Sequence, residues 1–254
     1  MEIPGDVQST CGSESSHEHF EGDLSYNRGY EYRLMFEARK RNPEIRIYAL
    51  EWSVPGWVGN GSIMDAKGDY TSTNRRYTLD WLRGARHHWN ISTIDYLGFW
   101  NEPGALAPPE YIKTMRAELD ASGFGETKLV AFDTGESAGQ QLVPAMATDL
   151  ALQRAVHAFG FHGGPNKAGG AGWLPGYLAL DPKTRPKLWA SEDGNLPVSM
   201  GGAQMWGKTH NENWLNLNVT ATVRWSLIWS AYPGPRRNLI HCGWSHDCHH
   251  RGCM

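Results

Sequence analysis

Short apolar runs alternate along this chain with longer stretches in which apolar residues recur every three or four positions. The short runs are typical of β-strands, and the longer stretches are typical of helices with one buried face. In the stretch 29–41, for example, Leu34, Met35 and Ala38 share one helical face. The runs predict strands at 45–50, 94–100, 129–132, 156–161, 188–191 and 220–229, after the clipped end of a strand at 2–4.

The helical pattern fills the intervals between these strands, at 29–41, 73–89, 108–122, 140–152, 173–180 and 211–218. Strict alternation of strand and helix implies a parallel sheet with helices outside it, and near-continuous apolar strands suit burial on both faces. No glycine-rich phosphate loop follows a predicted strand, which argues against an open, doubly wound nucleotide-binding sheet. The fold expected is therefore α/β, of the (β/α)₈ or TIM-barrel type.

Length and composition agree with this fold and narrow the classes of partner. A chain of 254 residues is about the length of one such barrel, and 40% hydrophobic with 20% charged residues is typical of a soluble globular protein. The formal net charge of −3 gives no reason to expect a nucleic acid or an anionic membrane surface as partner. No apolar run reaches membrane-spanning length, so we expect no transmembrane segment.

Aromatic and cysteine residues leave two questions open. The 12 Trp and 10 Tyr residues could include platforms for sugar rings, although core packing explains them equally well. Three of the four Cys residues lie at or beyond position 242, so no disulfide framework extends through the fold. Sequons at Asn60, Asn90 and Asn218 permit a secreted glycoprotein, while the N-terminus lacks the basic and apolar regions of a signal peptide.

Two glutamates follow predicted strands directly, Glu102 after the strand at 94–100 and Glu192 after the strand at 188–191. Active sites of (β/α)₈ barrels form at the C-terminal ends of the strands. A retaining glycosidase needs two carboxyl groups about 5–5.5 Å apart, one to protonate the leaving oxygen and one to bond the sugar covalently. One isolated glutamate at a strand end is better explained as a helix cap or a solvent-facing residue. The combination of Asn101-Glu102 with a second strand-end glutamate favours a catalytic pair.

Long stretches around these residues resemble the galactocerebrosidases of glycoside hydrolase family fifty-nine, in the clan of Glu/Glu barrels. The resemblance covers roughly residues 2–232 and includes the strand around Trp225. Both residue type and spacing agree, which makes the resemblance specific. The matching stretches are 29–31, 37–43, Trp52-Ser53-Val54-Pro55-Gly56-Trp57, Asp95-Tyr96-Leu97-Gly98-Phe99-Trp100-Asn101-Glu102, Lys187-Leu188-Trp189-Ala190-Ser191-Glu192-Asp193, 200–202 and 206–207.

The resemblance implies an activity and a role for each matching residue. It implies a retaining β-glycoside hydrolase that removes galactose from galactosylceramide-like glycolipids, without cofactor or metal. Glu102 matches the acid/base, Glu192 the nucleophile, and Asn101 the asparagine that binds the sugar 2-hydroxyl. The family also implies a lysosomal or secreted protein, with a possible lipid-presenting activator protein as partner.

Four further residues are implied to bind substrate. Thr10 and Trp52 match residues that line the galactose pocket, and Trp225 matches a tryptophan that helps floor the site. His162 matches a family histidine near the nucleophile, where a structural role is about as expected as a functional one. The family follows that histidine with tyrosine, whereas this chain has Gly163. This departure, Glu51 in place of a proline, and Gly194-Asn195 after the nucleophile could change which aglycone is accepted.

Other charged residues near strand ends are interpreted mainly as structural. Glu51 is expected to be a loop or rim residue rather than a third catalytic carboxylate. Asp133 and Glu136 are expected to make structural hydrogen bonds. Asp193 should point away from the site, because alternate residues of a strand face opposite ways. Asp6, which lies near Thr10 in the sequence, is expected to help shape the sugar pocket.

Histidines outside the predicted site are interpreted as solvated or as part of an unusual tail. His87 and His88 should lie on a solvated helix face. The tail at 236–254 combines Cys and His residues, which suggests a zinc knuckle, but their spacing fits no standard ligand pattern. We therefore interpret the tail as a reading-frame error or an unstructured artefact, and expect no metal.

The domain organisation expected is a partial catalytic barrel at 1–235 followed by the tail. By comparison with the family, the first strand, the last helix and the β-sandwich and lectin-like domains are missing. Unpaired strand edges would then make the chain unstable or inactive. Two alternatives to a galactosylceramide hydrolase stay open, a Glu/Glu barrel acting on a polysaccharide, such as a galactanase or xylanase, and a non-catalytic sugar-binding remnant.

Overall fold

The computed structural model describes residues 2–3, 16–59, 68–163, 172–194, 199–225, 228–229 and 240–241. The chain divides into two compact units, which meet in the sequence between Phe132 and Asp133.

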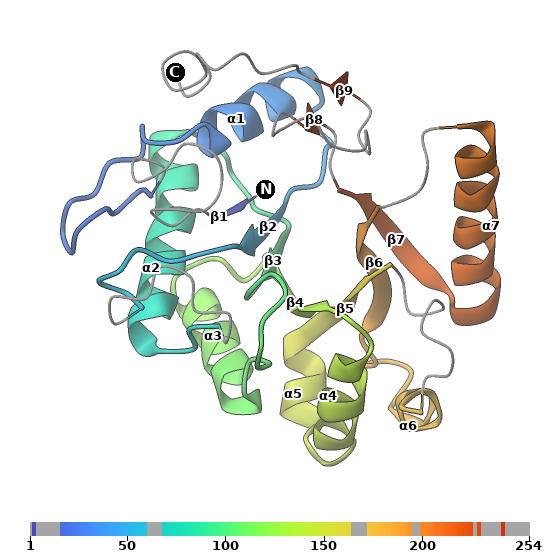
Figure 1. Ribbon diagram of the computed structural model, residues 1–254. Helices are drawn as coiled ribbons and strands as arrows, with labels where there is room; N and C mark the ends of the chain where they lie inside the picture. The colour runs from blue at the N-terminus through green and yellow to red at the C-terminus, as the bar shows by residue number, and fades with distance from the viewer. Residues whose placement is uncertain are drawn as a thin grey trace. The chain divides into compact units, whose positions relative to one another are not determined.

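The first unit alternates parallel strands with helices (Figure 1). Its strands are hydrogen-bonded neighbours in chain order, and each pair is parallel. The strands are β1 (Glu2–Ile3), β2 (Tyr48–Glu51), β3 (Tyr96–Gly98) and β4 (Lys128–Thr134), of which β4 continues into the second unit. The helices are α1 (Glu31–Arg41), α2 (Ser72–Arg83), the π-helical segment η2 (Gly84–His88) and α3 (Pro109–Ala121).

The second unit has the same alternation. Its strands β5, β6 and β7 are also parallel neighbours in chain order, and a further parallel pair, β8 and β9, follows them. The strands are β5 (Val156–His162), β6 (Lys187–Asp193), β7 (Val219–Arg224), β8 (Ile228–Trp229) and β9 (Ile240–His241). The helices are α4 (Ser137–Thr148), α5 (Leu150–Ala155), α6 (Leu174–Ala179) and α7 (Met200–Leu217).

Burial in both units follows the layered arrangement that the apolar runs predict. In the first unit, Tyr77 and Trp81 of α2 are fully buried, as is Leu97 of β3. In the second unit, β5 is buried at four successive positions, 158–161, so both of its faces are covered. Strands buried on both faces are typical of parallel sheets that have helices outside them. The predicted α/β alternation and the parallel strands are confirmed, and the closure of a full barrel and its missing elements stay predictions.

Several element boundaries differ from the prediction for local reasons. The helix predicted at 140–152 is interrupted at Asp149, whose side chain accepts a hydrogen bond from the Leu152 amide and starts α5. Helix α7 is much longer than the predicted 211–218 and ends at Asn218, which adopts a left-handed conformation with φ of 52°. Strand β7 stops at Arg224, before the predicted end at 229. Side-chain caps and left-handed residues decide such boundaries, and hydrophobic periodicity does not register them.

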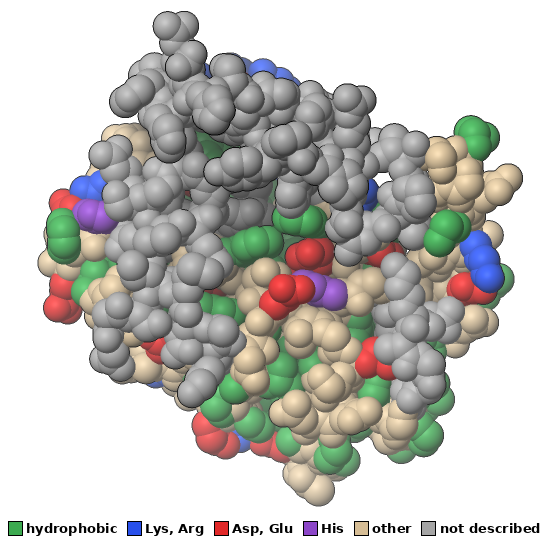
Figure 2. All heavy atoms as spheres, in the orientation of Figure 1, with side chains coloured by type: hydrophobic (Ala, Val, Ile, Leu, Met, Phe, Trp, Pro, Cys, Tyr) green, Lys and Arg blue, Asp and Glu red, His purple; other side chains and the backbone are tan. Residues whose placement is uncertain are grey.

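Helix α7 exposes more large apolar side chains than any other described helix. Figure 2 shows hydrophobic side chains on the outer surface of this helix. Met200 and Leu215 are each more than three-quarters exposed, and Trp214 is more than half exposed. Among the described residues, none of the helices combines the length and apolar character needed to cross a membrane.

Candidate active site

Glu192 and His162 lie opposite each other at the C-terminal ends of β6 and β5. The two strands pair in regular register up to Phe161 and Ala190, after which the register shifts and His162 pairs with Glu192. A β-bulge re-aims the side chains around it, and bulges recur next to active sites. The bulge therefore brings the imidazole and the carboxylate of these two residues together, which the predicted strand boundaries did not reveal.

A second carboxylate, from Asp133 of β4, approaches the same histidine. The His162 Nε2 atom lies 3.3 Å from Asp133 Oδ2 and 3.7 Å from Glu192 Oε2. The Asp133 side chain is 1% exposed, whereas the Glu192 side chain is 21% exposed. One ring nitrogen thus faces a buried carboxylate and a partly solvated one. The pattern of charged residues at strand ends had indicated Asp133 only as a structural hydrogen-bonding residue.

The backbone around Glu192 is also held by neighbouring strand ends. The Gly163 amide donates to the Glu192 carbonyl oxygen at 2.8 Å. Gly163 has φ of 76°, a conformation that glycine adopts without the steric cost that other residues pay. Gly163 therefore makes a tight turn in the backbone directly after His162.

Trp225 lies beside the residues that follow Glu192. Its amide donates to the Asp193 carbonyl oxygen at 3.0 Å, and its own carbonyl oxygen accepts from Arg224 Nη1 at 2.6 Å. A Cβ atom on Gly194 would lie 2.9 Å from the Trp225 carbonyl oxygen, so this close approach requires glycine. Trp225, predicted to floor the sugar site, therefore belongs to the same strand-end cluster of the second unit as Glu192.

In the first unit, Asn101 and Glu102 follow β3. The Asn101 amide donates to the Glu51 carbonyl oxygen at 2.8 Å, which extends the pairing of β2 and β3 beyond the last assigned strand residue. Glu102 is exposed and has φ of 46°. A left-handed conformation is uncommon for a residue with a side chain, and such residues cluster at functional sites. Glu102 belongs to the first unit and Glu192 to the second, so their pairing stays a prediction.

Trp52 directly follows β2, and its amide donates to the Ile3 carbonyl oxygen at 3.3 Å. The loop that begins with Trp52 is fixed farther along by Trp57, whose indole N–H donates to the Glu18 carbonyl oxygen at 2.9 Å. The guanidinium carbon of Arg76 lies 4.8 Å from the ring centre of Trp57. The loop of the predicted sugar-binding residue Trp52 is therefore anchored to the 16–28 segment and to α2.

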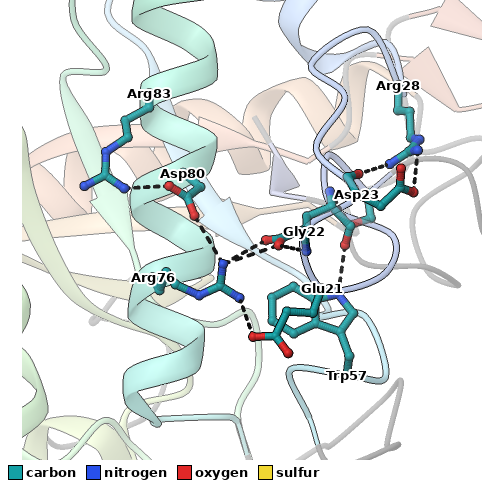
Figure 3. Close-up of polar contacts among 10 residues, drawn as sticks. Glu21, Gly22, Asp23, Arg28, Trp57, Arg76, Asp80 and Arg83 are labelled. Atoms are coloured by element: carbon teal, nitrogen blue, oxygen red, sulfur yellow. Dashed lines mark hydrogen bonds and ion pairs between the residues drawn. The ribbon is translucent and has the colours of Figure 1, made fainter.

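Arg76 is the centre of this anchoring network (Figure 3). It extends from α2 to the fully buried carboxylate of Glu18, with Nη1 3.3 Å from Oε1. The same carboxylate accepts from the Gly22 amide at 2.7 Å. Arg76 also lies 3.6 Å from Glu21 and from Asp80. A buried carboxylate is strongly destabilising when its partner is removed, because the charge is left without compensation.

We predict that Arg76→Met lowers the free energy of unfolding by about 3 kcal/mol, the lower end of the range for breaking a buried pair, because Arg76 is 39% exposed. Arg83→Met is the matched control on the same helix, because Arg83 is 43% exposed and its described ion pair is with the partly exposed Asp80 rather than with a fully buried carboxylate. Its loss should cost less than about 1 kcal/mol. Urea unfolding of both variants measures the difference. Equal effects would contradict this assignment.

The prediction that Glu51 is a loop or rim residue was wrong. It is the last residue of β2 and is 2% exposed. Its carboxyl group accepts from Asn74 Nδ2 at 2.7 Å and from Thr78 Oγ1 at 3.4 Å. Burial raises the pKa of Glu51 well above its ordinary value, and the neighbouring Asp69 raises it further, against the effect of the two hydrogen bonds. The burial of Glu51 was not predicted, because a charged residue next to a loop that contains tryptophan is normally expected to be exposed.

We predict that the free energy of unfolding of the wild type, measured relative to that of Glu51→Gln, falls as the pH rises from about 5 to 7. Below the ordinary pKa of 4.5 the carboxyl is protonated in both the folded and the unfolded state. Above it the unfolded chain releases the proton and the folded chain retains it, so the free energy of unfolding decreases by up to about 1.4 kcal/mol per pH unit. Thermal unfolding at several pH values measures this. A difference that stays constant over this pH range would contradict it.

The other predicted residues are placed as follows. His87 and His88 are exposed as predicted, although they lie in the π-helical segment η2. Glu136 precedes α4 and is partly exposed. Asp193 is fully buried, in contrast to the partly exposed Glu192 beside it. Thr10, Asp6 and the Cys and His residues predicted to form an unusual tail lie outside the described residues, apart from the backbone of His241 in β9.

Comparison with protein families gives one match over most of the chain. The model of glycosyl hydrolase family 59 matches residues 1–239. The galactocerebrosidase of Salmo salar is 37% identical over 234 residues, which are 91% of this chain and 32% of that protein. The galactocerebrosidase of Homo sapiens is 37% identical over 238 residues and is covered to 31%. The chain thus spans about a third of the length of the curated relatives it matches.

Solved structures show likeness at the level of the fold. SrfJ from Salmonella typhimurium has a TM-score of 0.65 at 18% identity, with 90% of this chain and 57% of that chain covered. The endo-β1,6-glucanase BT3312 has a TM-score of 0.66 at 16% identity, with 95% and 59% covered. Because identity is low, these likenesses show a shared fold and carry no conclusion about substrate. The family match and the 37% identical relatives carry the assignment: this chain belongs to glycosyl hydrolase family 59.

Proposed function

We propose that the protein containing this chain is a retaining β-glycoside hydrolase that removes β-linked galactose from galactosylceramide-like glycolipids. The observation that carries the proposal is Glu192, a partly exposed carboxylate at the end of a parallel strand, held against His162, in a chain 37% identical to galactocerebrosidases. Strand ends are where catalytic carboxylates of this fold class are found. The named activity of the relatives supports galactose and a ceramide-like aglycone.

In the first step, the Glu192 carboxylate attacks the anomeric carbon while the Glu102 carboxylic acid protonates the glycosidic oxygen. The carbon–oxygen bond to the aglycone breaks, the aglycone leaves as an alcohol, and galactose is bound to Glu192 as an α-linked ester. In the second step, Glu102 as a carboxylate takes a proton from water, and the water oxygen displaces Glu192. Two inversions at one carbon give net retention, which requires about 5–5.5 Å between the two carboxyl groups.

The remaining predicted residues bind and orient the sugar. Asn101 is proposed to donate to the 2-hydroxyl, an interaction that strengthens in the oxocarbenium-like transition state. Trp52 and Trp225 are proposed to pack against the C–H faces of galactose, and Thr10 to complete the pocket. The left-handed backbone at Glu102 supports this assignment, because it turns the chain sharply at the residue that must reach the leaving oxygen.

The proposed cellular setting follows the same resemblance. We place the protein in the lysosome or outside the cell, where a lipid-presenting activator protein could deliver the glycolipid. Two of the three sequon asparagines, Asn90 and Asn218, are exposed, as glycosylation requires. The third, Asn60, lies outside the described residues.

Proton NMR of an aryl β-galactoside during hydrolysis by the full-length protein tests the proposal. The β-anomer of free galactose should be detected first, before mutarotation supplies the α-anomer. Early α-galactose would show inversion and contradict the mechanism. Absence of hydrolysis would favour a sugar-binding remnant instead. Faster turnover of galactan or xylan oligosaccharides than of galactosylceramide would replace the glycolipid by a polysaccharide as the substrate class.

A further inference from the structure

We propose that Asp133 is a positioning residue for Glu192 and that it acts through the imidazole of His162. This inference rests on the proposed function, because it assigns a role to Asp133 in the reaction of Glu192. It begins from the arrangement in which His162 Nε2 lies 3.3 Å from a buried carboxylate oxygen and 3.7 Å from the oxygen of the partly exposed one.

The first step of the argument is the burial of Asp133. Its side chain is 1% exposed, and within the part of the chain that the structure describes neither of its oxygens receives a hydrogen bond of normal geometry. A carboxylate removed from water without compensation is strongly destabilising. The imidazole nitrogen at 3.3 Å is the compensating group that the described residues offer. Asp133 and His162 therefore form a unit whose partner on the solvent side is Glu192.

The second step concerns the proton on His162. A lone pair on Nε2 would face two carboxylates and be repelled by both, whereas an N–H at this atom is attracted by both. The pair of carboxylates therefore selects the form of the ring with hydrogen on Nε2. Because Asp133 is fixed in the interior and Glu192 is partly solvated, Asp133 determines the orientation of the ring and the ring determines the orientation of Glu192.

The third step explains why two carboxylates serve this purpose better than one. When the sugar is bonded to Glu192, that group becomes a neutral ester and attracts the N–H of His162 less strongly. Asp133 takes no part in the bond changes, so the ring retains an acceptor and stays in place. When water releases the sugar, the Glu192 carboxylate returns beside an N–H that has not moved. Fixed dipoles of this kind need no reorganisation at the moment of reaction.

The bulge between β5 and β6 supports this role of His162. The register shift after Phe161 places His162, rather than Gly163, opposite Glu192. The hydrogen bond from the Gly163 amide to the Glu192 carbonyl fixes the backbone at the same point. The side chain of Glu192 thus faces His162, the last residue of β5, and its backbone is held by Gly163, the next residue. Asp133 supports the first of these two contacts.

A double-mutant cycle with the full-length protein tests the inference. Asp133→Asn should lower kcat for 2,4-dinitrophenyl β-galactoside roughly 10- to 100-fold, the range for residues that orient a reacting group from behind, with KM little changed. In a His162→Gln background the same substitution should have almost no further effect, because its route to Glu192 is already lost. The control is Asp193→Asn. Asp193 is also buried but does not make the contact with His162 that Asp133 makes, so the effects of Asp193→Asn and His162→Gln on kcat should multiply.

A second readout does not depend on activity. Nitrogen-15 NMR of histidine-labelled protein, with the His162 signal assigned by its loss in His162→Gln, should show the proton on Nε2 in the wild type and partial transfer to Nδ1 in Asp133→Asn. An unchanged kcat in Asp133→Asn, multiplicative effects with His162→Gln, or an unchanged ring proton would overturn the inference. If the wild type hydrolyses no galactoside, the proposed function fails, and the ring proton alone decides whether Asp133 controls His162.

Discussion

Glu192→Gly should reduce kcat for aryl β-galactosides by on the order of 10⁴-fold or more, because the variant has no carboxylate to form the covalent intermediate. Added azide should restore turnover, since the shortened side chain leaves room for a small anion on the α face of the sugar. The product should be α-galactosyl azide, because azide takes the place of Glu192. Steady-state kinetics and NMR of the azide product measure both effects.

The control for this variant is a glutamate outside the predicted site. Glu212 lies on α7, with its side chain 44% exposed and 3.6 Å from Lys208. Glu212→Gly should leave kcat close to that of the wild type and show no response to azide. Retention of more than a tenth of the activity by Glu192→Gly, or formation of the β-azide, would assign the nucleophile to another residue.

Glu102→Ala should slow the hydrolysis of galactosides with poor leaving groups, such as glycolipids, by roughly 10²- to 10⁴-fold. Galactosides with the 2,4-dinitrophenolate leaving group need no proton, so their first step should be nearly as fast as in the wild type. The second step should be slow, because water has lost its base, and the covalent intermediate should accumulate. We therefore expect a burst of dinitrophenolate and a lower KM for this substrate.

The anomer formed with azide separates the two glutamates. In Glu102→Ala, azide should attack the covalent intermediate from the face that water normally uses and give β-galactosyl azide. Glu110→Ala, an exposed glutamate at the start of α3, is the control and should resemble the wild type. Equal slowing of good and poor leaving groups in Glu102→Ala would contradict its assignment as the acid/base.

The sequence predicted the order and type of most elements because their apolar patterns are strong. Strand β5 is a continuous apolar run with four successive buried positions. Helix α2 has the helical spacing of apolar residues, with Tyr77 and Trp81 fully buried. Boundaries were less predictable, because they depend on individual side chains. Asp149 starts a new helix by capping it, and Asn218 ends α7 in a left-handed conformation. Neither effect alters the hydrophobic pattern.

The sequence identified site residues but not the contacts between them, because those contacts depend on how neighbouring strands are aligned. Strand ends identified Glu102, His162 and Glu192, because polar residues there interrupt apolar runs. The sequence did not reveal that a bulge pairs His162 with Glu192, or that Asp133 lies 3.3 Å behind the histidine. The pairing of His162 with Glu192 follows from a one-residue shift between β5 and β6, and such a shift leaves no mark in composition or periodicity. The contact of Asp133 with His162 joins β4 to β5, and the sequence pattern of neither strand reveals it.

Burial of Glu51 has the same kind of cause. Its carboxyl group is stabilised in the interior by Asn74 and Thr78, which stand on α2 more than twenty positions along the chain. A local reading of the sequence assigns a charged residue beside Trp52 to the surface. The long-range hydrogen bonds, and the rise in the pKa of Glu51 that burial causes, become evident only from the packing of α2 against the end of β2.

The central claim is that Glu192 bonds covalently to galactose during catalysis. The most direct test is to incubate the full-length protein with 2,4-dinitrophenyl 2-deoxy-2-fluoro-β-galactoside, which forms the intermediate but hydrolyses it slowly, and to identify the modified peptide by mass spectrometry. The account predicts one fluorogalactosyl group per protein, attached to Glu192 and lost on reactivation. Attachment to any other residue, or hydrolysis of ordinary aryl galactosides without any labelling, would contradict it.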